Sequence, residues 1–139
     1  MNRKEFIKKC GFACLGAGLS VSLLESCIAR GVTGKIVNTD INVPLDSFKD
    51  KNYIVVENEM LQYPIFVHKT SETEYSAVLM QCTHQGAELQ AFGDTLECPA
   101  HGSQFDAKGN LKGGPANQDL RKFPVSINEN QLKISLKNV

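Results

Sequence analysis

Two short motifs, each with one cysteine and one histidine, constrain this chain of 139 residues more than any other feature. Cys82-Thr83-His84 is separated from Cys98-Pro99-Ala100-His101 by the thirteen residues 85–97. Each motif offers one thiol and one imidazole within a single turn of chain. If the four groups act together, the fold must hold two loops side by side on a rigid support.

Two cysteines and two histidines suit several kinds of site. A [2Fe–2S] cluster can take two thiolates on one iron and two imidazoles on the other. Cys82 and Cys98 would then bind the first iron, and His84 and His101 the second. Zinc also takes two Cys and two His, but its common patterns place Cys near Cys and His near His. Cys82 could instead be a nucleophile with His84 or His101 as its base, or form a disulfide with Cys98.

Outside the motifs, the chain from about residue 35 onward shows short β-rich runs in place of helical periodicity. Three runs are expected to be strands: 54–56, 65–67 and 75–80. Near the end, apolar and polar residues alternate on both sides of a turn at 128–130, which predicts a hairpin with one buried face. The sequence therefore predicts an all-β fold. His68, which ends one run, is expected to be a surface or packing residue.

The stretch between Cys82 and Pro115 lacks this alternation and is rich in glycine. Glycine-rich, non-alternating segments are typical of loops, and binding residues are often placed on loops that a rigid scaffold supports. We therefore expect loops here that carry both motifs.

The motifs and their neighbours resemble a known family. Residues 82–86 and 98–103 resemble the two cluster-binding boxes of the Rieske iron–sulfur proteins, and the likeness continues through Phe105-Asp106 and Gly109. Gly114-Pro115-Ala116 resembles the proline-containing loop that covers the cluster in that family.

This resemblance implies one [2Fe–2S] cluster per chain. It also implies an antiparallel β-sandwich or barrel over residues 36–139, with a small cluster-binding subdomain inserted at about 81–114. Gly86 and Gly102 are expected to allow close approach of a partner to the histidines, and Pro115 to stiffen the covering flap.

The chain also departs from the family. Quinol-oxidising members join the two loops by a disulfide, and Ala87 and Ala100 stand at those cysteine positions. In the high-potential members, a serine and a tyrosine each donate a hydrogen bond to sulfur. Ser103 keeps the serine, whereas Phe105 stands in place of the tyrosine and cannot donate. These bonds stabilise the reduced state. We therefore expect a low-to-intermediate potential within the range of about −150 to +300 mV.

Residues 1–26 are expected to be an export signal. A basic start precedes an uncharged run from Cys10 to Leu24, shorter than the roughly 20 apolar residues that span a bilayer. Residues 24–27 (Leu-Glu-Ser-Cys) resemble a bacterial lipobox, which would make Cys27 the lipid-modified first mature residue. Residues 3–8 resemble a twin-arginine signal with Lys4 in place of the second Arg. An uncleaved anchor and a helix packed on the domain are the alternatives.

We therefore expect an exported bacterial electron carrier on the periplasmic or cell-surface side, anchored through Cys27, with residues 27–35 as a linker. Its redox partner would be a cytochrome, a membrane oxidoreductase such as a quinol–cytochrome oxidoreductase, or a quinol. The chain is not expected to catalyse a reaction alone, although it could be the Rieske subunit of an oxidoreductase. A ferredoxin that feeds a Rieske oxygenase and a zinc-stabilised binding module are the alternatives.

Nucleic acid is not an expected partner. The 15 basic and 15 acidic residues give a formal net charge of zero, and no basic stripe is present of the kind that binds phosphate backbones.

Overall fold

The computed structural model of the protein describes Glu5 and residues 31–137. Apart from Glu5, the expected export signal lies outside these residues, and so does the lipidation site Cys27. No helix within the described part of the chain is both long and apolar enough to cross a membrane.

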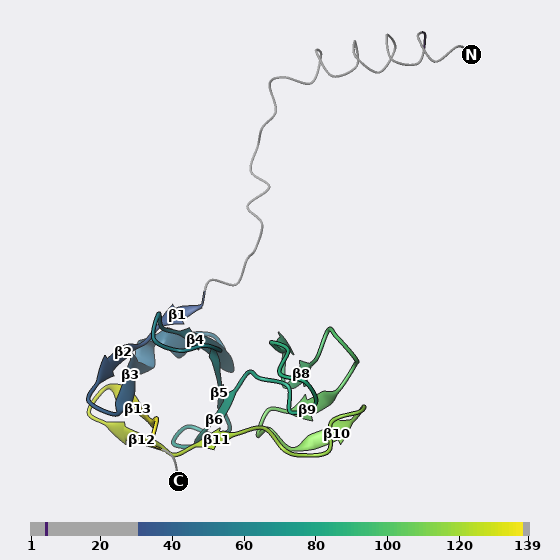
Figure 1. Ribbon diagram of the computed structural model, residues 1–139. Coiled ribbons are helices and arrows are strands. Elements are labelled where there is room, and N and C mark those ends of the chain that lie inside the picture. The colour runs from purple at the N-terminus through teal and green to yellow at the C-terminus, as the bar shows by residue number, and fades with distance from the viewer. Residues whose placement is uncertain (1–4, 6–30, 138–139) are drawn as a thin grey trace.

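Two sheets form the larger part of the molecule, here named the base sandwich (Figure 1). One sheet has the strand order β1-β4-β5-β6-β11 and the other the order β12-β13-β3-β2. Their elements are β1 (Val32–Thr33), β2 (Lys35–Val37), β3 (Asp40–Pro44), the 3-10 helix η1 (Leu45–Phe48), β4 (Tyr53–Glu57), β5 (Ile65–Lys69), β6 (Tyr75–Leu79), β11 (Lys122–Phe123), β12 (Val125–Asn128) and β13 (Gln131–Ser135). The three expected strands and the expected C-terminal hairpin, β12–β13, are thus confirmed.

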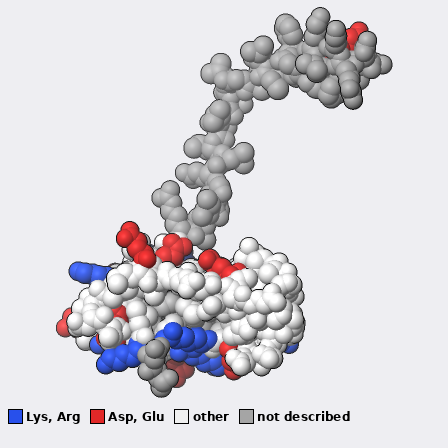
Figure 2. Space-filling view, in the orientation of Figure 1, with Lys and Arg blue, Asp and Glu red and all other residues white. Residues whose placement is uncertain are grey.

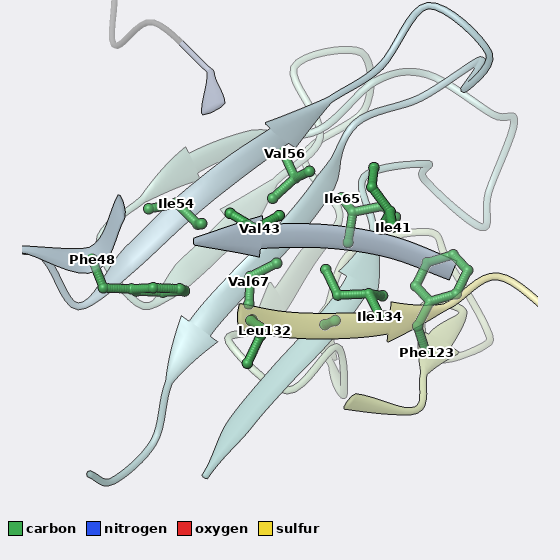
Figure 3. Packing of buried hydrophobic residues seen from close by; sticks show 11 residues of the cluster. Ile41, Val43, Phe48, Ile54, Val56, Ile65, Val67, Phe123, Leu132 and Ile134 are labelled. Carbon is green, nitrogen blue, oxygen red and sulfur yellow. The ribbon is translucent and has the colours of Figure 1, made fainter. Parts of the chain in front are cut away.

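The core of the base sandwich follows from the period-two alternation of its strands. Alternate residues of β3, β4 and β13 point inward and are almost fully buried: Ile41, Val43, Ile54, Val56, Leu132 and Ile134. Figure 3 shows these side chains together with Phe48, Ile65, Val67 and Phe123. Because both sheets contribute to one apolar layer, the sandwich is a rigid support for whatever is inserted into it.

The inserted segment contains a sheet of its own, to one side of the base sandwich (Figure 1). Its order is β10-β9-β8-β7, with β7 (Gln90–Phe92), β8 (Thr95–Glu97), β9 (Gln104–Asp106) and β10 (Leu111–Gly113). The expectation of loops alone was therefore incomplete. Each of these strands has only three residues, too few for alternation to be visible in the sequence.

The domain begins earlier than expected. Residues 32–35, expected to belong to a linker, form β1 and the first residue of β2. Strand β1 pairs with β4 in parallel, whereas the other strand pairs of the described chain are antiparallel. A Cβ atom on Gly34 would lie 2.5 Å from Ile41 Cδ1, so the absence of a side chain there lets this segment pack closely on the core.

Candidate metal centre

The first motif lies in a tight loop, named the first loop, over residues 82–87. The amide of Cys82 donates to the carbonyl of Ala87 at 2.8 Å, and the amide of Gly86 donates back to the carbonyl of Cys82 at 2.9 Å. Gly86 has a φ of 78°, in the left-handed region that glycine adopts without steric cost. Gly86 is therefore required because it closes the loop. The sequence had suggested a different reason, namely that a small residue here lets a partner approach the histidines.

The second motif lies in a loop of the same construction, the second loop, over residues 98–103. Cys98 donates to the carbonyl of Ser103 at 2.8 Å, and Gly102 donates to the carbonyl of Cys98 at 2.9 Å. Gly102 has a φ of 76°, and a Cβ atom there would meet nothing within 4 Å. The two loops thus match in their backbone bonds, although the histidine is the third residue of one and the fourth of the other.

The structure brings the two cysteines, each the first residue of its loop, into one buried cluster. Cys82 and Cys98 are 2% and 1% exposed, and both thiols are free. Burial disfavours ionisation of Cys98, but hydrogen bonds from the backbone amides of His101 and Ala100 and from the Cys82 side chain outweigh it and lower the pKa of this thiol. A lowered pKa favours the thiolate, which is the form that binds metals.

The two histidines, one from each loop, lie side by side. Their ring centroids are 4.9 Å apart, with the ring planes at 85°. His101 is exposed and His84 half-buried. His84 Nδ1 is buried and has no hydrogen-bond partner, which is costly for a polar atom unless another group satisfies it. A metal ion bound at this nitrogen would supply the missing partner.

The arrangement suits a two-metal cluster. Among the described residues, no three His, Cys, Asp or Glu side chains gather closely enough to hold one metal ion. A structural zinc ion takes four ligands, whereas a [2Fe–2S] cluster with mixed ligands needs only two protein groups on each iron. A pair of buried thiols and a pair of imidazoles meet that second requirement.

A flap, residues 113–118, packs against the second loop. The amide of Ala116 donates to Ser103 Oγ at 3.1 Å, and Ser103 is fully buried. Gly114 has a φ of 89°, and a Cβ atom there would lie 2.5 Å from Ser103 Cα. Pro115 is exposed, and Phe105 is fully buried in the apolar cluster that also contains both cysteines.

Two contacts at the site involve residues that sequence reasoning missed. The Tyr63 hydroxyl donates to the carbonyl of Gly86 at 2.7 Å, and Thr83 Oγ1 donates to the carbonyl of Gln118 at 2.7 Å. Tyr63 lies 23 residues from its partner and Thr83 lies 35 from its own, so no local pattern could reveal either bond. His68 packs on Phe66 with ring centroids 6.3 Å apart.

The fold and the site define an iron–sulfur protein. The Rieske [2Fe–2S] domain family matches residues 41–124, more than half of the chain, and the chain therefore belongs to this family. Its cofactor is a [2Fe–2S] cluster, a group that takes up and releases one electron at a time.

Curated relatives are subunits of cytochrome complexes. The cytochrome b6-f complex iron–sulfur subunit 2 of Nostoc sp. is 33% identical over 60 residues, which cover 42% of this chain and 34% of that protein. The ubiquinol–cytochrome c reductase iron–sulfur subunit of Blastochloris viridis is 38% identical over 65 residues, covering 45% and 36%. The chain thus spans about a third of the length of these relatives.

Solved structures share the fold. The plasma membrane Rieske protein of the cyanobacterium Synechocystis PCC 6803 has a TM-score of 0.58 and 25% identity, covering 72% of this chain and 99% of that one. A chain from the complex of oxygenase and ferredoxin in carbazole 1,9a-dioxygenase has the same TM-score at 22% identity, covering 74% and 98%. The second likeness concerns the fold alone.

Proposed function

We propose that Cys82 and Cys98 bind one iron of the cluster and that His84 and His101 bind the other. The observation that carries this assignment is the matched pair of loops. Their two cysteine thiols are buried together, and the centroids of their two imidazole rings are 4.9 Å apart. The unpartnered Nδ1 of His84 fits this assignment because its ring lies beside that of His101, whereas His68, whose Nδ1 is equally unpartnered, stacks on Phe66.

The surrounding residues have distinct tasks in this proposal. The buried apolar cluster around the cysteines excludes water from their side of the site. His101 is exposed, so an electron enters or leaves at the imidazole side, where a partner can approach. The flap holds Ser103 in place because Ser103 Oγ accepts a hydrogen bond from the Ala116 amide. The hydroxyl proton of Ser103 can then be donated to a sulfur atom.

The reduction potential follows from the same residues. Hydrogen bonds to cluster or ligand sulfurs raise the potential because they favour the more negative reduced state. Ser103 can donate one such bond, and Phe105 cannot donate any. We propose a low-to-intermediate value within the range of about −150 to +300 mV for Rieske centres. A titration giving a value near the top of that range would contradict this.

We propose that the chain serves an exported, membrane-associated redox chain, as the electron-carrying subunit of an oxidoreductase such as a quinol–cytochrome oxidoreductase. The cytochrome-complex relatives support a partner of that kind. The signal-like residues 1–26 and the lipobox-like segment ending at Cys27 support export and a lipid anchor.

The ligand assignment is tested on the purified holoprotein. The wild type should contain two irons and two sulfides per chain, and give a Rieske-type electron paramagnetic resonance spectrum on reduction. Cys82→Ser and His101→Ala should each abolish that spectrum, while His68→Ala, the matched control, should keep it. A colourless, zinc-loaded wild type would overturn the proposal, and so would a Cys82→Ser or His101→Ala variant that keeps the native spectrum.

The anchor is tested separately in cells. A fatty-acid analogue should label the wild type, and Cys27→Ala should remove the label. An unlabelled wild type in the cytoplasmic fraction would contradict export and would favour a ferredoxin role.

A further inference from the structure

We infer that Tyr63 is a positioning residue for His84, an inference that rests on the ligand set proposed above. Tyr63 lies in the connection 58–64 between β4 and β5 of the base sandwich. Its hydroxyl donates to the carbonyl of Gly86 at 2.7 Å, two residues beyond His84. This bond joins the base sandwich directly to the first loop.

His84 is bracketed by two such bonds. One residue before it, Thr83 Oγ1 donates to the carbonyl of Gln118 in the flap at 2.7 Å. Two residues after it, the Gly86 carbonyl is held by Tyr63. A Cβ atom on Gly86 would lie 3.3 Å from Gln81 Nε2 and 3.7 Å from the Tyr63 hydroxyl, so both side chains pack closely on this residue. The backbone that carries His84 is therefore fixed at both ends.

Tyr63 can act as an anchor because its own segment is fixed. Asn58 Nδ2 donates to the carbonyl of Gly34 at 2.8 Å, which ties the start of the connection to the base sandwich. The carbonyl of Pro64 accepts the amide of Met80 at 2.9 Å, which ties its end to the strand that leads into the first loop. The backbone that carries the Tyr63 side chain is therefore anchored at both ends of the connection.

Both loops are bonded to the flap, and the first loop has a further bond to the base sandwich. The second loop lies directly under the flap, with Ser103 Oγ bonded to Ala116 and Gly114 packed on the Ser103 backbone. Ala87 and Ala100 cannot form a disulfide that would join the loops. Hydrogen bonds to other segments therefore hold the first loop, and the bond from Tyr63 ties it to the base sandwich.

The test compares the wild-type holoprotein with Tyr63→Phe, which removes only the hydroxyl. The variant should show a broadened or shifted spectrum of the reduced cluster, because His84 is less well oriented. Cluster loss to a chelator should be about two- to tenfold faster, the factor for one hydrogen bond. Ile54→Val is the control, because it removes a methylene from the base core away from the first loop.

Ile54→Val should lower the melting temperature and leave the spectrum unchanged. Tyr63→Phe with a native spectrum and native cluster retention would overturn the inference. An equal spectral change in both variants would also overturn it, because Tyr63 would then act only through stability. A wild type without a Rieske spectrum would instead contradict the ligand assignment, so the two failures are distinguishable.

Discussion

At the scale of single residues, Ser103 and Phe105 flank Gln104, and in the proposed site they set the polarity around the sulfur atoms of the cluster and its ligands. Both are fully buried, so a hydrogen bond that either of them makes is not weakened by competing water. The Ser103 hydroxyl is oriented by its hydrogen bond with the Ala116 amide. The Phe105 ring has no hydrogen-bond donor.

Changing these two residues should move the reduction potential in opposite directions. Ser103→Ala should lower it and Phe105→Tyr should raise it, each by about 20–65 mV, if one bond contributes about 0.5–1.5 kcal/mol to the reduced state. Redox titration of the holoproteins measures both. Ser126→Ala, on the exposed face of β12, is the control and should leave the potential unchanged. Shifts of the same sign in both variants would contradict the assigned roles.

At the scale of elements, the inserted sheet and the flap form one unit around the second loop. Strand β9 follows the second loop and β10 leads into the flap, and the turn between these strands is organised by Asp106. Its Oδ1 accepts the amides of Lys108 and Asn110, each at 2.9 Å. This turn sets the direction of β10, and the flap that follows β10 packs on Ser103.

The neighbouring glycines Gly113 and Gly114 provide a matched test of that contact. Gly114→Ala should destabilise the holoprotein by about 1–3 kcal/mol, because it combines a positive φ with a backbone clash. A Cβ atom at Gly113 would meet nothing within 4 Å, so Gly113→Ala should change the free energy of unfolding much less. Guanidinium unfolding, with cluster absorbance followed in parallel, measures both. Equal effects of the two substitutions would show that the flap does not press on the second loop.

At the scale of the whole molecule, charge is distributed unevenly. The three segments around the proposed ligands, 82–87, 98–103 and 113–118, contain no Asp, Glu, Lys or Arg. Figure 2 shows a similar contrast, because the face over β8–β10 is mostly uncharged while acidic and basic side chains gather over the base sandwich. A partner that reaches the histidines therefore meets loops without charged side chains, and Arg121 lines the edge of the hollow that Thr83, His84 and Gln85 also line.

A charge introduced into the uncharged first loop should make electron exchange more sensitive to salt. Gln85→Glu should slow oxidation of the reduced protein by hexacyanoferrate(III) about threefold or more at ~10 mM ionic strength, and less than about twofold at ~0.5 M, where charges are screened. Stopped-flow absorbance measures the rates. Gln131→Glu, on β13 of the base sandwich, is the control. A larger effect at Gln131 than at Gln85 would place the electron exit elsewhere.

The sequence by itself determined the candidate ligands and the β class of this protein. Cys82, His84, Cys98 and His101 could be named because motif spacing is a local property. Strands β4, β5 and β6 could be predicted from short β-rich runs, and the β12–β13 hairpin could be predicted because alternate residues of one strand share a face. Strands β1, β2, β3 and β11 were not predicted. The short strands β7–β10 could not be predicted, since three residues carry too little pattern.

Only the tertiary structure decided how the site is held. The bonds from Tyr63 to Gly86, from Thr83 to Gln118 and from Ala116 to Ser103 span 23, 35 and 13 residues of chain. The parallel pairing of β1 with β4 also joins distant segments. Such contacts depend on where the folded backbone brings two groups together, and the type of one residue and its neighbours does not contain that information.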